Sequence, residues 1–160
     1  MKKLLKNKKI VFFDIDYTLF DCDNFKNSNL KDYKNYDETG KVLKDLSKKN
    51  DLGIFSEGEK DLQEKKLEKT GIKKYFNRNN IYMLQGKSLS IKKIFKKYKN
   101  DSVFLIDDKL TILNEVKILC PFVFTVWVKR GIYAQKQESI KGFIPDAQVT
   151  DLNELKNIIK

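Results

Sequence analysis

The sequence predicts an α/β fold, a three-layer, Rossmann-like open sheet of about five parallel strands. Five short apolar runs, rich in β-branched and aromatic side chains, are spaced along the 160 residues. Segments with the 3.6-residue periodicity of helices separate these runs. Such alternation of strands and helices favours a parallel sheet with right-handed crossovers and with helices on both of its faces.

The strands are predicted from the apolar runs in chain order. The first run, residues 10–13, is continuously apolar and is followed at once by acids. A continuous run, as opposed to an alternating one, is typical of a strand that is buried on both faces. Four later runs have the same character, and we expect the remaining strands at residues 52–55, 81–84, 103–106 and 122–128.

The helices are predicted between and after these strands, at residues 37–48, 60–70, 88–98, 110–119 and 151–159. Gly71 directly follows the second of these segments, where glycine commonly ends a helix. Ser88 or Ser90, and Asp151, are candidate N-caps, because their side chains can accept a hydrogen bond from the first helical turn.

The chain is predicted to form one domain, residues 1–160. It contains only 2 prolines and 7 glycines, and neither type forms a linker that would divide it. The least patterned segment, residues 21–36, is polar with scattered aromatic residues, and we interpret it as a short flap.

The absence of histidine excludes several chemistries. A chain with 0 histidines has no Ser-His-Asp or Cys-His nucleophile and no His-ligated metal site. No apolar run approaches the roughly 20 residues of a bilayer span. Cys22 and Cys120 are isolated, and the basic start of the chain lacks the apolar segment of a signal peptide. We therefore expect a cytoplasmic protein without a membrane partner.

The formal net charge of +11 would attract polyanions. Only Arg78 and Arg130 are arginines, and the lysines are dispersed without the aromatic residues of a base-stacking groove. Nucleic-acid binding is therefore not the favoured interpretation. A phosphorylated small molecule or a macromolecular substrate both fit the charge, and the oligomeric state is left open.

Polar residues directly follow four of the predicted strands. In an open α/β sheet, ligands bind beyond the carboxyl ends of the strands, so these residues converge on the ligand crevice. They are Asp14 and Asp16 after the first strand, Ser56, Glu57 and Gly58 after the second, Lys87 after the third, and Asp107 and Asp108 after the fourth.

Four carboxylates cannot gather in one crevice without a cation or bound protons, because like charges a few ångströms apart repel strongly. Oxygen ligands without histidine or paired cysteines favour Mg²⁺ over Zn²⁺. A carboxylate beside such a cation can attack phosphorus, and a second acid two residues away can transfer protons to and from the leaving oxygen and water. The pattern therefore favours phosphoryl transfer.

The order of these motifs resembles that of the haloacid dehalogenase-like (HAD) superfamily of phosphohydrolases. The residues that carry the resemblance are Asp14-Ile15-Asp16-Tyr17-Thr18, then Ser56, Lys87 and Asp107-Asp108. It extends from Ile10 to a final stretch at residues 145–155, which is similar to the family's last strand and helix. The run Ser56-Glu57-Gly58, with Gln63, Lys66 and Leu67 after it, is also similar to small members of the family.

The resemblance implies a role for each matching residue. Asp14 would be the nucleophile and a metal ligand, and Asp16 the general acid and base, with its backbone carbonyl on Mg²⁺. Thr18 would orient the loop. Ser56 and the N–H groups of Glu57 and Gly58 would hold phosphoryl oxygens, with the Glu57 side chain pointing outward, and Lys87 would neutralise charge. Asp107 would bind Mg²⁺, with Asp108 in support.

Several alternatives stay open at this level. Ser56 also fits a helix cap, Lys87 a solvated lysine with Lys92 in its place, and Asp108 a structural role. The short intervals between the motifs leave no room for a sizeable cap domain, so the sequence predicts a minimally capped, Mg²⁺-dependent phosphatase of unassigned substrate. A phosphatase for nucleotides or polynucleotide ends is one alternative, and a non-catalytic, receiver-like phosphate-binding module is the other.

Overall fold

The sheet has six parallel strands in the order β3-β2-β1-β4-β5-β6, in a computed structural model that describes residues 9–160. The strands are β1 (Lys9–Phe13), β2 (Asp51–Glu57), β3 (Ile81–Leu84), β4 (Ser102–Asp107), β5 (Phe124–Val128) and β6 (Ala147–Val149). The first five lie where the apolar runs predict them. The sixth has only three residues, of which Val149 alone is buried, so its apolar pattern is too short to predict a strand. It lies in the stretch 145–155, where the family resemblance implies a last strand and helix.

The helices that cover the sheet differ more from the prediction. They are α1 (Cys22–Asn27), α2 (Thr39–Leu46), α3 (Lys60–Lys69), α4 (Ile91–Phe95), α5 (Leu110–Leu119), α6 (Gly131–Lys136) and α7 (Leu155–Ile158). The predicted helix at 88–98 is divided, with a 3₁₀ turn before and after α4. The short helices α1 and α6 were not predicted, because six residues carry too little periodicity to identify a helix.

The helix caps follow the local sequence. Gly71 has a φ of +71° just beyond the C-cap of α3, where a residue with a Cβ is strained. Asp151 caps the turn before α7, and Glu154 completes a reciprocal capping box with it. Neither Ser88 nor Ser90 provides a side-chain cap hydrogen bond to the turn or helix that it begins.

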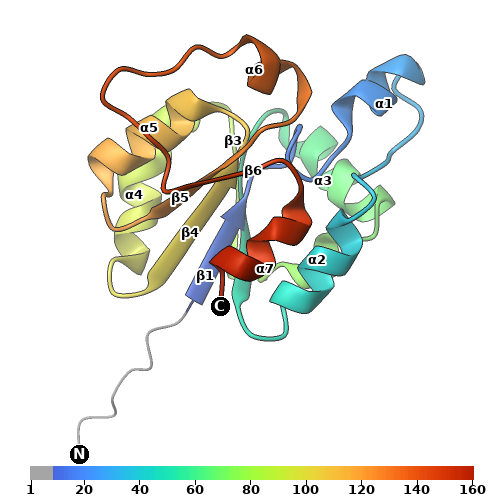
Figure 1. Ribbon diagram of the computed structural model, residues 1–160. Coiled ribbons are helices and arrows are strands. Elements are labelled where there is room, and N and C mark those ends of the chain that lie inside the picture. Colours follow the sequence, from blue (N-terminus) through green and yellow to red (C-terminus); the bar gives the residue numbers. More distant parts are fainter. Residues whose placement is uncertain (1–8) are drawn as a thin grey trace, which may run out of the picture.

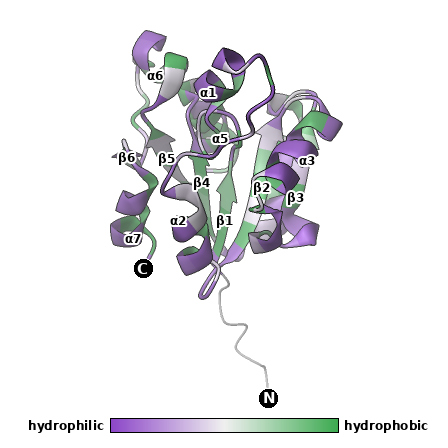
Figure 2. Ribbon diagram, turned by 90° about the vertical axis from the view of Figure 1, so that its right-hand side faces the viewer, coloured by the Kyte–Doolittle hydropathy of each residue, from purple (hydrophilic) through white to green (hydrophobic). Residues whose placement is uncertain are grey.

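Two apolar cores lie on opposite faces of the sheet. Successive strand residues point to opposite faces, so Phe12 packs into one core while Val11 and Phe13 pack into the other. The helices α4 and α5 cover the first face, and α2, α3 and α7 the second. In Figure 2 the central strands are mainly hydrophobic and the helices around them are largely hydrophilic. This is the predicted three-layer α/β arrangement.

The carboxyl edge of the sheet is covered by short segments only. Figure 1 shows α1 and α6 beyond the ends of the strands on this side. The predicted flap, residues 21–36, contains α1 and a returning loop, and Phe25 packs its ring 5.3 Å from Phe20 and 4.8 Å from Tyr33. Within residues 9–160, no helix has both the length and the apolar character needed to cross a bilayer.

Candidate active site

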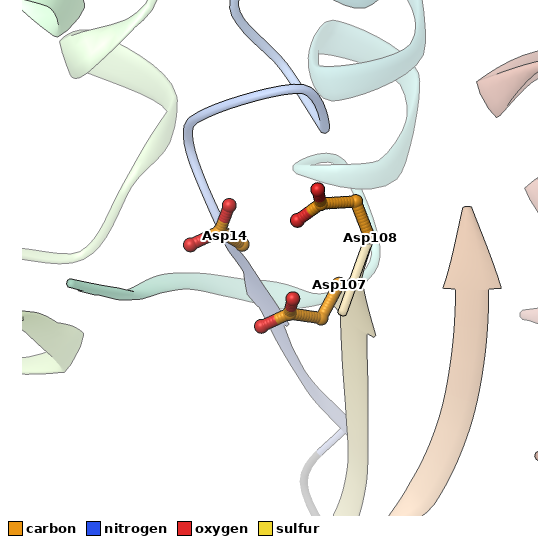
Figure 3. Close-up of side chains that lie close together, drawn as sticks. All are labelled: Asp14, Asp107 and Asp108. Carbon is orange, nitrogen blue, oxygen red and sulfur yellow. The ribbon is translucent and has the colours of Figure 1, made fainter. Parts of the chain in front are cut away.

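The register of the central strands brings three acids together. Phe13 of β1 pairs with Ile106 of β4, so Asp14 and Asp107 occupy adjacent positions at the carboxyl edge, and the Asp14 N–H donates to the Ile106 carbonyl at 2.9 Å. Asp108 follows directly. One carboxylate oxygen from each acid lies within 4.8 Å of the others, and all three side chains are buried. Figure 3 shows the three carboxylates at the ends of the two strands.

A buried lysine bridges two of these acids. Lys87 is 2% exposed, and its Nζ donates to Asp14 Oδ1 and to Asp107 Oδ2, each at 2.6 Å. Lys92, the alternative candidate, is exposed. An ammonium group leaves water only where anions compensate for the lost hydration, so Lys87 is part of the cluster and is not a solvated lysine.

One ammonium does not neutralise three carboxylates. Burial raises the pKa of Asp14 from 3.8 to about 7, against the effect of Lys87 and helped by Asp107. Burial, followed by the charges of Asp107 and Asp14, raises the pKa of Asp108 from 3.8 to about 9. Burial by itself lowers the pKa of Lys87, but Asp107 and Asp14 outweigh it, so this pKa is raised. Without a cation, these buried carboxyl groups therefore retain protons at pH values at which carboxyl groups in water have lost them.

The residues of this cluster fit a divalent cation. Both carboxylate oxygens of Asp108 are buried, and neither has a hydrogen-bond partner among residues 9–160. A buried carboxylate without a partner is costly, and a hard cation compensates for it directly. The donors are all oxygens, as Mg²⁺ prefers. Asp14, Asp107 and Asp108 are thus the side chains that would hold it.

Ser56 and its neighbours lie on the other side of Asp14. The Ser56 hydroxyl is fully buried and donates to Asp14 Oδ1 at 3.1 Å, so it does not act as a helix cap. The exposed Glu57 turns its carboxylate to the backbone N–H of Lys87, at 2.8 Å. The Gly58 N–H donates to the Leu84 carbonyl at 2.9 Å, so in this conformation it is not available to a phosphoryl oxygen.

Thr18 lies inside the loop that follows β1. This loop turns tightly, because the backbone N–H groups of Thr18, Leu19 and Phe20 all point to the Ile15 carbonyl. Thr18 is completely buried, and its hydroxyl has no partner among the described residues. Tyr17, beside it, has a φ of +57° and packs its ring edge-on to Tyr133, 5.9 Å away.

Asp16 is close to the three acids in sequence, but its carboxylate is bound elsewhere. Lys66 Nζ donates to Oδ1 at 2.5 Å, Gln63 Nε2 donates to Oδ2 at 3.2 Å, and the Cys22 thiol points to Oδ1 at 3.3 Å. The Asp16 side chain is still 35% exposed. The sequence places Asp16 at the site, and the tertiary structure supplies the three donors that orient it.

Gln63 and Lys66 are the residues whose contacts sequence reasoning did not assign. They lie three positions apart on α3 and share its buried face with Leu67. Polar residues on the buried face of an amphipathic helix were the available signal. Arg130, one of the two arginines, forms a largely buried ion pair with Glu38.

A cavity of about 310 Å³ opens over these side chains. Asp14, Asp16 and Asp108 line its floor, while Lys26 and Leu30 of the flap and Tyr133 of α6 are among its walls. Larger cavities lie between α2 and the C-terminal residues and along β3, and neither includes any of the clustered acids. The cavity beside the acids is therefore the candidate substrate site.

Neither a protein-family model nor a curated protein sequence matches the chain. Solved structures do match it. A candidate haloacid dehalogenase-like hydrolase from Burkholderia xenovorans aligns with a TM-score of 0.78 and 18% identity over 96% of this chain and 97% of that one. The candidate HAD-hydrolase YfnB from Bacillus subtilis, bound to magnesium, aligns with a TM-score of 0.73 and 15% identity over 97% and 100%.

A candidate phosphatase from Clostridium difficile aligns with a TM-score of 0.68 and 18% identity, over 97% of this chain and 100% of that one. The similar structures also include L-2-haloacid dehalogenases, one of them with chloropropionic acid covalently bound. The identities are low, so these matches bear on architecture and leave the substrate open. The chain has the haloacid dehalogenase-like fold, as the order of its motifs predicts.

Proposed function

We propose that this protein is a Mg²⁺-dependent phosphatase that hydrolyses a phosphate monoester through an aspartyl-phosphate on Asp14. The observation that carries the proposal is the environment of Asp14. Its Oδ1 accepts hydrogen bonds from Ser56 and Lys87, and it lies beside the carboxylate of Asp108, which has no hydrogen-bond partner among residues 9–160. The nucleophile and part of a candidate cation site thus line one cavity, and two buried hydrogen-bond donors contact the nucleophile directly.

Two displacements complete the reaction. In the first, a carboxylate oxygen of Asp14 attacks phosphorus, the bond to the leaving oxygen breaks, and Asp16 gives its proton to that oxygen. In the second, Asp16 takes a proton from water as the water attacks the same phosphorus, which breaks the bond to Asp14 and releases phosphate. Asp16 thereby regains its proton and Asp14 its carboxylate.

The other groups stabilise charge and position the phosphoryl group. Lys87 and the Ser56 hydroxyl are placed to neutralise and orient its oxygens. When bound, Mg²⁺ would neutralise the phosphate and the carboxylates of Asp14, Asp107 and Asp108. Tyr17, Tyr133 and residues of the flap line the cavity in which the phosphoryl group would bind.

Dehalogenation is the competing hydrolysis, because L-2-haloacid dehalogenases are among the similar structures. A halide leaves without needing a proton, and a haloacid carries less negative charge than a phosphate monoester dianion. A second acid beside the nucleophile and a cluster suited to a divalent cation therefore favour phosphate over a haloacid.

The proposal is tested with the purified protein, MgCl₂ and a generic phosphate ester. We expect turnover that EDTA abolishes and that Asp14→Asn lowers by on the order of 10³-fold or more, since the variant has no nucleophile. An unchanged melting temperature shows that Asp14→Asn is folded. Equal turnover by the wild type and Asp14→Asn would refute the proposal, as would turnover of 2-chloropropionate but of no phosphate ester.

The panel that identifies the substrate also separates the alternatives. It compares sugar phosphates, nucleoside monophosphates and 5′- or 3′-phosphorylated oligonucleotides. Preference for an oligonucleotide, with activity falling steeply as salt rises, would support a polynucleotide-end phosphatase. Phosphate retained on Asp14 for minutes without net hydrolysis would support the receiver-like module.

A further inference from the structure

We propose that Lys66 and Gln63 are positioning residues that hold the carboxylate of Asp16 for proton transfer with the leaving group. This inference rests on the proposed function, because it concerns the proton that Asp16 gives to the substrate. Neither residue touches the three clustered acids in the part of the chain that the structure describes. Their effect on the reaction would pass through Asp16 and, for Gln63, through Ser56 as well.

The Lys66 contact is buried, although the carboxylate that it binds is open to the cavity. The Lys66 side chain is 7% exposed and that of Asp16 is 35% exposed, with 2.5 Å between Nζ and Oδ1. The ammonium group also lies 5.2 Å from the centre of the Phe20 ring, a cation–π contact that adds to its ion pair with Asp16. Lys66 lines the same cavity as Asp16 but is mostly buried, so it holds Oδ1 at the edge of the cavity while about a third of the Asp16 side chain stays exposed.

Gln63 connects Asp16 to the neighbourhood of the nucleophile. Its Nε2 lies 3.2 Å from Asp16 Oδ2, 3.1 Å from Ser56 Oγ and 3.0 Å from the Glu57 carbonyl. Because the Ser56 hydroxyl donates to Asp14, the chain of contacts runs from Asp16 through Gln63 and Ser56 to Asp14. Two N–H groups are shared among three acceptors, which fixes the amide in one orientation.

Gly58 provides the space for this amide. It has a φ of +146°, and a Cβ at this position would lie 3.0 Å from Gln63 Nε2. The backbone at the end of β2 and just after it thus lies directly against the Gln63 amide. Three donors on one carboxylate, two of them from the same face of α3, leave Asp16 little rotational freedom.

A positioning role predicts a specific kinetic signature. A general acid matters most where the leaving oxygen is strongly basic, and matters little where the leaving group departs as a stable anion. Loss of Lys66 should therefore slow hydrolysis of an alkyl phosphate much more than that of 2,4-dinitrophenyl phosphate. A structural defect would slow both substrates alike, and loss of a direct phosphate contact would raise KM for both.

The experiment measures kcat and KM for glycerol 2-phosphate and 2,4-dinitrophenyl phosphate, with saturating MgCl₂, for Lys66→Met, Lys66→Arg and Gln63→Met. Asp16→Asn is the reference for the lost acid. Lys69→Met, at an exposed lysine of the same helix, is the matched control. Calorimetric Mg²⁺ titration provides a measurement that does not depend on activity.

For Lys66→Met we expect kcat on glycerol 2-phosphate to fall about 10²-fold, within the range of general acid catalysis, and kcat on 2,4-dinitrophenyl phosphate to fall less than about 3-fold. The KM values and the Mg²⁺ affinity of Lys66→Met should stay within about 2-fold of those of the wild type. Lys66→Arg should have a higher kcat on glycerol 2-phosphate than Lys66→Met. Gln63→Met should also lose more activity on glycerol 2-phosphate than on 2,4-dinitrophenyl phosphate, but by a smaller factor. Combining Lys66→Met with Asp16→Asn should add little to Asp16→Asn alone.

Equal losses on the two substrates, a change confined to KM, or additivity with Asp16→Asn would each overturn the assignment while leaving the phosphatase proposal intact. A wild-type protein that hydrolyses neither substrate would overturn both. If Lys66→Met does not fold, Gln63→Met and Lys66→Arg provide the test. A positioning role is contradicted if both of these variants lose the same fraction of kcat on glycerol 2-phosphate and on 2,4-dinitrophenyl phosphate.

Discussion

Asp108 is the residue whose surroundings most directly require a ligand. Its backbone carbonyl accepts hydrogen bonds from Trp127 Nε1 at 3.0 Å and Gln137 Nε2 at 2.8 Å, which fixes the main chain. Its carboxylate has no such partner within residues 9–160. The fold thus immobilises the residue and leaves its side chain unsatisfied, an arrangement suited to a cation and costly without one.

The metal-free protein should lose stability as pH rises from about 6 to about 9. The pKa of Asp14 is raised from 3.8 to about 7 and that of Asp108 from 3.8 to about 9. Over this range the folded state holds protons that the unfolded state has released, so the free energy of unfolding falls with increasing pH. Melting temperatures in EDTA measure this slope, and a flat or rising profile would contradict it.

Asp108→Asn should flatten that slope and raise the melting temperature of the metal-free protein at pH 8, because it removes a buried carboxylate that has no partner in the described part of the chain. The same change should reduce the stabilisation given by Mg²⁺, since a ligand oxygen loses its charge. Differential scanning fluorimetry with and without MgCl₂ tests both effects. Undiminished stabilisation by Mg²⁺ would exclude Asp108 as a ligand.

At the scale of secondary structure, α3 has two functions in one short helix. Its N-terminus is capped by Glu59, whose carboxylate accepts from the Asp61 and Leu62 N–H groups at 3.0 Å and 2.7 Å. Its buried face contributes Leu67 to the core and brings Gln63 and Lys66 to the site. A substitution that weakens the N-terminal cap of α3 is therefore expected to lower the stability of the fold and to disturb the orientation of Asp16 as well.

Two glycine substitutions should change stability in opposite directions. Gly71→Ala should cost about 1 kcal/mol, because φ is +71° there and a Cβ is strained. Gly40→Ala, within α2 where a Cβ would meet nothing within 4 Å, should stabilise by about 0.5–1 kcal/mol. Urea unfolding of both variants provides the comparison. A stabilising Gly71→Ala would show that the end of α3 is not held in this conformation.

At the scale of the whole molecule, acidic groups gather at the carboxyl edge of the sheet, although the chain as a whole is positively charged. Three buried acids face a single bridging lysine, in a protein whose formal net charge is +11. The positive excess attracts phosphate esters generally. Selection among them falls to the cavity of about 310 Å³ and its walls.

This charge excess predicts that moderate salt stabilises the protein. Lysines at the surface repel one another, and about 0.1 M salt screens exposed charges beyond about 10 Å. With Mg²⁺ saturating, the melting temperature should rise as NaCl increases from 20 to 200 mM. The double variant Lys49→Glu and Lys99→Glu, at exposed positions, should show a smaller rise. An equal or larger rise would mean that surface repulsion is not the cause.

The sequence determined the strands, because a strand buried on both faces needs a continuous apolar run such as residues 10–13. It also determined that polar residues would follow those strands, and hence the convergence of Asp14, Ser56, Lys87, Asp107 and Asp108. This was predictable because parallel strands present all their carboxyl ends at one edge, whatever their order in the sheet.

Only the tertiary structure decided which groups touch. Helical periodicity reveals that Gln63 and Lys66 share a face, but not that Asp16 lies opposite them, since that depends on the packing of α3 against the loop after β1. In the same way, the pairing of Gly58 with Leu84 and of Arg130 with Glu38 joins residues distant in the chain. The local sequence pattern determines which residues are buried and which lie at the carboxyl edge of the sheet. The partners of a side chain depend on how separate helices, strands and loops pack together.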